Sequence, residues 1–239
     1  MRLNELDVAG TQVDLAYNDR LNPLFWAGFE LKPDVHGQLQ RIAREFVKFL
    51  DIPEDYFLDF IITGSNASYN WSIHSDLDLH VLIDVKMLKE VAGPYVVDYL
   101  NTKRKLWNDS HNITLRDVRV ECYVQDANED HYSNGQFSLK TDAWIKKPEY
   151  KPFKYNDSEI VTKAEDLIAQ IDEYIQNGCD EESKVDELIA KIRDMRQCGL
   201  AREGEGSVEN LVFKVLRASG YLKKLFLCKN TAQDRDLSL

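Results

Sequence analysis

The sequence has few cysteines, lacks a long apolar run and carries no net positive charge, and each of these absences excludes a class of protein. The four cysteines contain no C-x-x-C pair, which disfavours a zinc site and predicts buried thiols in a reducing compartment. No apolar run approaches the roughly 20 residues that span a bilayer, and the first residues have no signal-peptide core. We therefore expect a cytoplasmic protein with no membrane partner. The cysteines are Cys122, Cys179, Cys198 and Cys228.

The formal net charge of −11 disfavours avid, non-specific binding of nucleic acid, although a local basic patch could still guide one. The chain is 44% hydrophobic and 10% aromatic, as expected of a globular protein. Its 239 residues are enough to bury a sizeable core in one large domain, or in a catalytic domain with a smaller companion.

The most informative stretch joins a glycine–serine turn to two carboxylates. Residues 57–62 are apolar except for Asp59 and predict a buried strand that ends in a tight turn at Gly64. From residue 76 onward, polar and apolar residues alternate, so Asp76 and Asp78 share one face of a strand. Two carboxylates this close repel each other unless they share a hard divalent cation. The alternative is an edge strand whose solvent face is charged.

Glu121 is the candidate third carboxylate. Residues 118–124 alternate in the same way and place Glu121 on one strand face with Arg119 and Tyr123. A strand that carries Glu121 beside the strand of the two aspartates would bring three carboxylates around one point. The alternative role of Glu121 is to pair with Arg119 or a nearby lysine.

Gly64–Ser65, then Asp76-x-Asp78, then a later strand acid, resembles the polymerase-beta-like nucleotidyltransferase superfamily. The resemblance implies that Gly64 and Ser65 contact the nucleotide phosphates. It also implies that Asp76, Asp78 and Glu121 are catalytic and hold two Mg²⁺ (or Mn²⁺) ions. Glu121 departs from the pattern, because aspartate is commoner there.

A narrower resemblance, to predicted nucleotidyltransferases of tailed bacteriophages, covers most of the chain. It implies the same fold and chemistry and, for a phage protein, the host cytoplasm. The segments that carry it are residues 21–26, 105–111, 120–125, 142–148 and 207–214.

Together, these features predict an α+β protein with a small mixed β-sheet nucleotidyltransferase core flanked by helices, followed by a C-terminal helical bundle. We expect an N-terminal arm at 1–35 that packs on the core, a catalytic domain at 36–150 and a helical domain at 156–230. Residues 146–155 contain two prolines and no periodicity, and they predict the linker.

Apolar spacing predicts the individual elements of these domains. The expected helices are 33–50, 84–107 with an interruption at Gly93–Pro94, 157–178, 185–195 and a third bundle helix capped by Ser207. The expected strands beyond the acidic ones are 113–115, 136–139 and 143–145.

Two basic clusters are candidate phosphate contacts. Lys214 and Arg217 lie one helical turn apart after a glycine-flanked loop, which predicts nucleotide binding, but the neighbouring glutamates equally fit a plain loop and a solvated helix. Residues 103–105 are Lys-Arg-Lys near a helix end, and their alternative role is a solvated helix terminus.

The predicted activity moves an NMP group from a nucleoside triphosphate, such as ATP, to an acceptor hydroxyl with release of pyrophosphate. The acceptor could be a short RNA or a small molecule. The alternative function is a catalytically silent module that binds a nucleotide or a host protein on the same fold.

Overall fold

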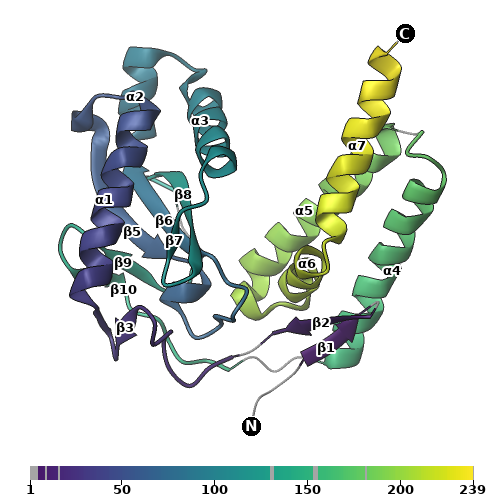
Figure 1. The fold of residues 1–239 in the computed structure, drawn as a ribbon, viewed down its shortest axis with the longest axis horizontal. Coiled ribbons are helices and arrows are strands. Elements are labelled where there is room, and N and C mark those ends of the chain that lie inside the picture. Colours follow the sequence, from purple (N-terminus) through teal and green to yellow (C-terminus); the bar gives the residue numbers. More distant parts are fainter. Residues whose placement is uncertain are drawn as a thin grey trace. The chain divides into compact units, whose positions relative to one another are not determined.

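The computed structural model describes residues 5–8, 10–15, 17–129, 132–152, 156–180 and 182–238. The chain divides into a sheet unit, Tyr17–Lys151, and a helical unit formed by Met1–Ala16 with Pro152–Leu239. The sheet unit combines a mixed sheet with helices, and helices dominate the other unit (Figure 1). The predicted α+β class is confirmed.

The sheet unit is built on a six-stranded sheet of order β10-β9-β5-β6-β8-β7. Strand β6 is antiparallel to β5 and parallel to β8, which makes the sheet mixed, as predicted. The strands are β5 (Phe57–Thr63), β6 (Leu77–Ile83), β7 (Thr114–Leu115), β8 (Val118–Asp126), β9 (Gln136–Ser138) and β10 (Ala143–Lys146). Short elements accompany it: β3 (Trp26–Ala27), β4 (Glu30–Leu31) and the 3-10 helices η1 (Glu54–Tyr56) and η2 (Ser65–Ala67).

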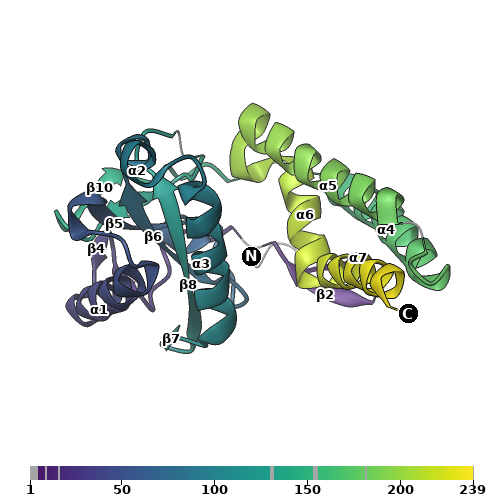
Figure 2. The same ribbon diagram turned by 90° about the horizontal axis from the view of Figure 1, so that it is seen from above.

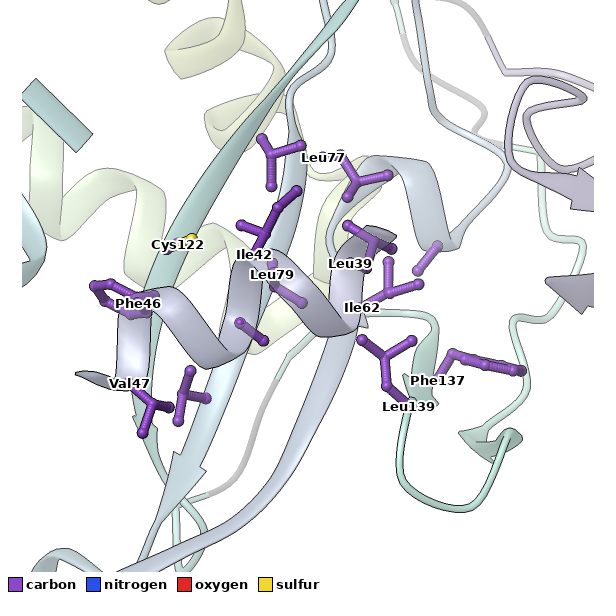
Figure 3. Close-up of a cluster of buried hydrophobic side chains, with 14 of the residues drawn as sticks. Leu39, Ile42, Phe46, Val47, Ile62, Leu77, Leu79, Cys122, Phe137 and Leu139 are labelled. Atoms are coloured by element: carbon purple, nitrogen blue, oxygen red, sulfur yellow. The ribbon is translucent and has the colours of Figure 1, made fainter. Parts of the chain in front are cut away.

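Helix α1 (Pro33–Leu50) covers one face of this sheet, because its apolar residues recur every three or four positions. It begins with Pro33 in the first turn and ends before Asp51, which adopts the left-handed conformation. Both ends are the predicted ones. In Figure 3, α1 contributes four of the labelled core side chains, Leu39, Ile42, Phe46 and Val47, to a cluster with Ile62, Leu77, Leu79, Cys122, Phe137 and Leu139.

The expected interrupted helix is two helices, α2 (Val85–Ala92) and α3 (Val96–Ser110). The Asp84 carboxylate caps α2 by accepting a hydrogen bond from the Met87 backbone N–H at 3.0 Å. Gly93, with φ 84°, separates the two helices. Helix α3 runs beside β8 in both views (Figures 1 and 2), which brings its side chains to that side of the sheet.

The predicted N-terminal arm at 1–35 is divided between the two units. Phe25 and Trp26 are buried in the sheet unit, whereas Leu24 and Phe29 of the same segment are exposed. The preceding hairpin, β1 (Glu5–Val8) with β2 (Thr11–Asp14), belongs to the helical unit and buries Leu6 and Val8 there. Each strand is four residues long, too short for alternation to distinguish it from an irregular segment.

The helical unit contains α4 (Asp157–Gln176), α5 (Glu182–Glu203), the 3-10 helix η3 (Gly204–Gly206), α6 (Val208–Ala218) and α7 (Tyr221–Leu237). Ser207 caps α6 as predicted, accepting from the Asn210 N–H at 3.3 Å. Asn156 caps α4, accepting from the Ser158 N–H at 3.1 Å. Helix α7 was not predicted, so the bundle is larger than expected.

The prediction of four buried thiols is wrong. Cys179 and Cys228 form a disulfide between the segment after α4 and helix α7. Cys198 is exposed, and Cys122 alone is a buried thiol. The two cysteines are 49 residues apart, and Cys228 lies on the helix that was not predicted. The spacing of the cysteines in the sequence therefore did not indicate the disulfide.

Within the described ranges, no helix is both long and apolar enough to cross a membrane.

Candidate active site

The turn after β5 lies directly against a carboxylate. Gly64 has φ 72° and ψ −160°, a conformation that is essentially restricted to glycine. A Cβ atom at this position would lie 1.8 Å from Oδ2 of Asp78. The glycine therefore allows the backbone to approach Asp78, and no other residue type fits there.

Asn66 fastens this turn to its surroundings. Its buried side-chain amide donates to the carbonyl oxygen of Asp76 at 2.8 Å, and its Oδ1 accepts from the Asn22 amide at 2.7 Å. Its own carbonyl oxygen accepts from Nε1 of Trp26 at 2.7 Å. The turn is thus tied both to the start of β6 and to the segment before α1. Sequence reasoning missed Asn66, because its partners are distant and its one signal is its place after Gly64–Ser65.

Asp78 and Glu121 are register partners on the parallel strands β6 and β8. Such partners lie on neighbouring strands about 4.8 Å apart and point to the same face of the sheet. Asp76 is half-buried and precedes β6 by one residue, so it stands at the strand entry and not within the strand. The structure thus brings Gly64, Asp78 and Glu121 to one place, with Ser65 in the adjoining turn.

The Glu121 carboxylate already has two partners. The Tyr123 hydroxyl donates to Oε2 at 2.6 Å, and Nε of Arg119 lies 3.8 Å from Oε1. The alternative role foreseen for Glu121, a partner of Arg119, is therefore present. Burial, then the charge of Asp78 and the hydrogen bond to Glu121, raise the pKa of Tyr123 far above its ordinary value. The phenol remains a proton donor at neutral pH.

Among the described residues, no three His, Cys, Asp or Glu side chains are gathered closely enough to hold a metal ion. Carboxylate oxygens are nevertheless the ligands that Mg²⁺ and Mn²⁺ prefer. Two such side chains stand in register beside a glycine whose missing Cβ leaves room at Asp78. The donor chemistry fits a divalent cation, and metal binding by Asp76, Asp78 and Glu121 stays a prediction.

The same face continues beyond the carboxylates. His80 is the register partner of Tyr123, and its Nδ1 lies 2.8 Å from Oε1 of Gln125. The His80 and Tyr123 rings are 4.9 Å apart. His80 is thus a hydrogen-bonded histidine within the sheet.

The basic cluster at 103–105 separates into different environments. The Arg104 guanidinium lies over the Tyr123 ring, with its carbon 5.4 Å from the ring centroid. Lys103 Nζ lies 4.4 Å from the Phe49 centroid. Lys105 is exposed, but α3 continues to Ser110 and has no basic residue in its last turn, so the expected place of the cluster at a helix end is wrong. Arg104 alone faces the carboxylate-bearing side of β8.

Lys214 and Arg217 lie on α6 of the helical unit, so their predicted contact with nucleotide stays a prediction. The first turn of α6 has partners within the protein. Oε2 of Glu209 pairs with Arg202 at 3.1 Å, and its Oε1 pairs with Lys163 at 3.5 Å. The Ser207 hydroxyl accepts a hydrogen bond from the Asn210 N–H, the third residue of α6.

No protein-family model matches the chain, and no curated protein sequence matches it. Among solved structures, it is similar to a STING-associated CdnE c-di-GMP synthase from Capnocytophaga granulosa, with 10% identity and a TM-score of 0.23 over 86% of this chain and 84% of the other. It is also similar to the spectinomycin adenyltransferase AAD(9) from Enterococcus faecialis with ATP and spectinomycin, at 12% identity and TM-score 0.23 over 82% and 99%. At this TM-score, neither likeness decides the fold or the activity of this chain.

Proposed function

We propose that the protein is a metal-dependent nucleotidyltransferase that moves an NMP group from a nucleoside triphosphate to an acceptor hydroxyl. One observation carries the proposal: the glycine-only turn at Gly64 lies against Asp78, whose register partner on the next parallel strand is Glu121. A phosphate-approaching turn and paired carboxylates are the two parts that nucleotidyl transfer requires. Here they occupy neighbouring strands.

The residues of this chain would act by binding and orientation. The Gly64 turn lets backbone N–H groups approach phosphate oxygens without a Cβ in the way, and Ser65 adds a hydroxyl. Asp76, Asp78 and Glu121 would hold the cations. Bound Mg²⁺ or Mn²⁺ would neutralise the triphosphate and lower the pKa of the acceptor hydroxyl.

The reaction balances without a further reactant. The acceptor oxygen forms a bond to the α-phosphorus, and the bond from that phosphorus to the bridging oxygen breaks. Pyrophosphate leaves with the electron pair, and the hydroxyl proton passes to solvent. Nucleotide binding by Lys214 and Arg217 is a separate part of the proposal. The proposal includes ATP as the donor and a short RNA or a small molecule as the acceptor. It also includes a cytoplasmic location and an origin in a tailed bacteriophage.

The second candidate is a catalytically silent module that binds a nucleotide or a host protein. A specific observation favours it: Glu121 is engaged by Tyr123 and Arg119, and the described part of the chain gathers no three metal-ligating side chains. Transfer requires the Glu121 carboxylate to bind a cation beside these partners or in place of one of them. A silent module requires neither.

Transfer of an α-³²P label distinguishes the two candidates. The purified protein is incubated with Mg²⁺ and each α-³²P-labelled nucleoside triphosphate, with and without total cellular RNA. The same assay is run on Asp78→Asn and on Asp109→Asn, which changes an exposed carboxylate on α3 and serves as the matched control.

We expect label in RNA, protein or a new small product with the wild type and Asp109→Asn, and none with Asp78→Asn. Equal labelling by Asp78→Asn would show that the carboxylate is not part of the chemistry. Metal-dependent nucleotide binding without transfer by any variant would favour the silent module.

A further inference from the structure

We propose that Arg104 forms a subsite for the phosphate group of a small acceptor molecule. This inference rests on the proposed transferase function and names the chemical class of the acceptor. It depends on where Arg104 lies relative to the two parts of the candidate active site, and on the bonding state of its guanidinium group.

The strand order gives the candidate active site two flanks. Gly64 directly follows β5, which pairs with β6 on one side of Asp78, while Glu121 lies on β8 on the other side. Helix α3, which carries Arg104, packs against β8. If the triphosphate binds at the glycine turn, the acceptor must approach the carboxylates from the opposite flank, because in-line transfer places donor and acceptor oxygens on opposite sides of the phosphorus.

Tyr123 connects Arg104 to the carboxylates. Its hydroxyl donates to Glu121 at 2.6 Å, and its ring lies under the Arg104 guanidinium at 5.4 Å from the centroid. The guanidinium is therefore on the same face as Glu121, one aromatic side chain away. A group bound by Arg104 would lie near the carboxylates without competing for their oxygens.

The guanidinium has unused donor capacity. Nε of Arg104 is buried and has no hydrogen-bond partner among the residues that the structure describes. Buried hydrogen-bond donors are paired in the great majority of cases, so an unpaired donor indicates that a ligand is missing from the site. The planar guanidinium fork matches two phosphate oxygens, and a phosphate would satisfy Nε together with a terminal nitrogen.

The net charge of the chain limits the size of this ligand. At −11, the protein disfavours a long polyanion, whose many phosphates would each be repelled. One phosphate monoester beside one arginine carries no such penalty. We therefore commit to a small acceptor with a phosphate group, of the size of a nucleoside monophosphate.

Binding measurements test this without turnover. Calorimetry measures AMP and adenosine binding to protein saturated with Mn²⁺ and a non-hydrolysable ATP analogue, so that AMP cannot occupy the donor site. The variants are Arg104→Gln, Arg104→Lys and Lys105→Gln. The last removes a neighbouring exposed charge from the same helix and is the matched control. Circular dichroism and thermal unfolding check that each variant folds.

We expect the wild type and Lys105→Gln to bind AMP more tightly than adenosine. Arg104→Gln should lose at least about tenfold in AMP affinity, with adenosine and analogue binding unchanged. Arg104→Lys should retain part of the AMP affinity, since it keeps the charge but loses the fork. A folded Arg104→Lys with intermediate affinity supports the inference even if Arg104→Gln does not fold.

Three results would overturn the inference. In the first, AMP binds the wild type no better than adenosine. In the second, Arg104→Gln weakens the analogue as much as AMP, which would assign Arg104 to the triphosphate. In the third, a ten-nucleotide RNA displaces AMP at a concentration far below the Kd of AMP, which would assign the subsite to nucleic acid. If the analogue itself does not bind, the proposed function fails, and the AMP comparison is then made on the protein alone.

Discussion

At the scale of single residues, Gly64 decides whether the candidate active site can form. The sequence predicts the turn at Gly64 and the carboxylate at Asp78 separately, from the end of an apolar run and from strand alternation. It does not predict that the two are in contact, because the contact depends on the pairing of Thr63 with Asp78 across β5 and β6. Strand register is a tertiary property that alternation alone leaves open.

Gly64→Ala should destabilise the protein and stop transfer. The backbone conformation alone costs a non-glycine residue about 1–3 kcal/mol, and the new Cβ would also collide with Asp78. Chemical denaturation measures the change in the free energy of unfolding. The control is Gly37→Ala, at an exposed α1 position with open space and ordinary φ, which should stabilise by about 0.5–1 kcal/mol. A Gly64→Ala protein as stable as Gly37→Ala would show that the turn is not built as described.

The double variant Gly64→Ala/Asp78→Ala separates the two causes. Removing the carboxylate removes the collision but not the backbone strain, so the double variant should be more stable than Gly64→Ala alone. Equal stability of the double and single variants would mean that Gly64 and Asp78 are not in contact.

At the scale of elements, α3 secures the edge of the strand that carries Glu121. The Asn108 side chain donates to the carbonyl oxygen of Cys122 at 2.9 Å and accepts from its N–H at 3.0 Å. These backbone groups belong to the side of β8 that faces away from β6, and an unpaired edge exposes just such groups. One amide thus replaces a missing strand partner next to Glu121.

Asn108→Ala should destabilise the protein by about 1–3 kcal/mol, the usual cost of leaving half-buried backbone groups without partners. Exposed Asn101 on the same helix supplies the control, and Asn101→Ala should leave the free energy of unfolding almost unchanged. Hydrogen exchange should also speed up at the Cys122 amide. Unchanged exchange there would contradict the role given to Asn108.

The elements also show what sequence periodicity can predict. Helix α1 matches its prediction at both ends, because a wide apolar stripe reaches Leu50 and Pro33 marks the first turn. Helix α7 was missed, because its buried side is narrow, with Leu225, Cys228 and Ala232 spaced three and four apart among polar residues. A stripe this thin is recognisable only once its packing partners in α4, α5 and α6 are known.

At the scale of the whole molecule, the disulfide between Cys179 and Cys228 disagrees with the reducing compartment that the cysteine spacing predicted. Disulfides persist in oxidising compartments and are rare in the cytosol. In the chain-entropy account, linking Cys179 to Cys228 across 49 residues stabilises the folded state by about 4 kcal/mol. Cysteine spacing could not reveal this, since the partners meet only when α7 packs on the bundle.

Thiol labelling tests the cysteine assignment. Without reductant, iodoacetamide at pH 8 should modify Cys198 alone, since burial raises the pKa of the Cys122 thiol to about 12 and keeps it protonated. Unfolding without reductant should expose two thiols, and unfolding with reductant four. Mass spectrometry counts the adducts. Four adducts in the unfolded, unreduced protein would contradict the disulfide.

The candidate active site was predicted in its main parts and not in its supports. Strand alternation and the glycine–serine pair pointed to Gly64, Asp78 and Glu121, which lie together in the structure and whose roles stay predictions. Asn66 and Tyr123 were not predicted as supports, because their partners come from other elements and from side-chain directions that no local pattern encodes. Lys214 and Arg217 lie in the other unit and remain untested.

The central claim is that Asp78 and Glu121 share a divalent cation, and Mn²⁺ binding tests it most directly. Electron paramagnetic resonance titrations with a non-hydrolysable ATP analogue compare the wild type with Asp78→Asn, Glu121→Gln and the double variant. We predict that each single change weakens Mn²⁺ binding by at least about tenfold and that the double change costs less than the sum. Wild-type Mn²⁺ affinity in Glu121→Gln would contradict the claim, and it would leave Glu121 as the partner of Tyr123 and Arg119 alone.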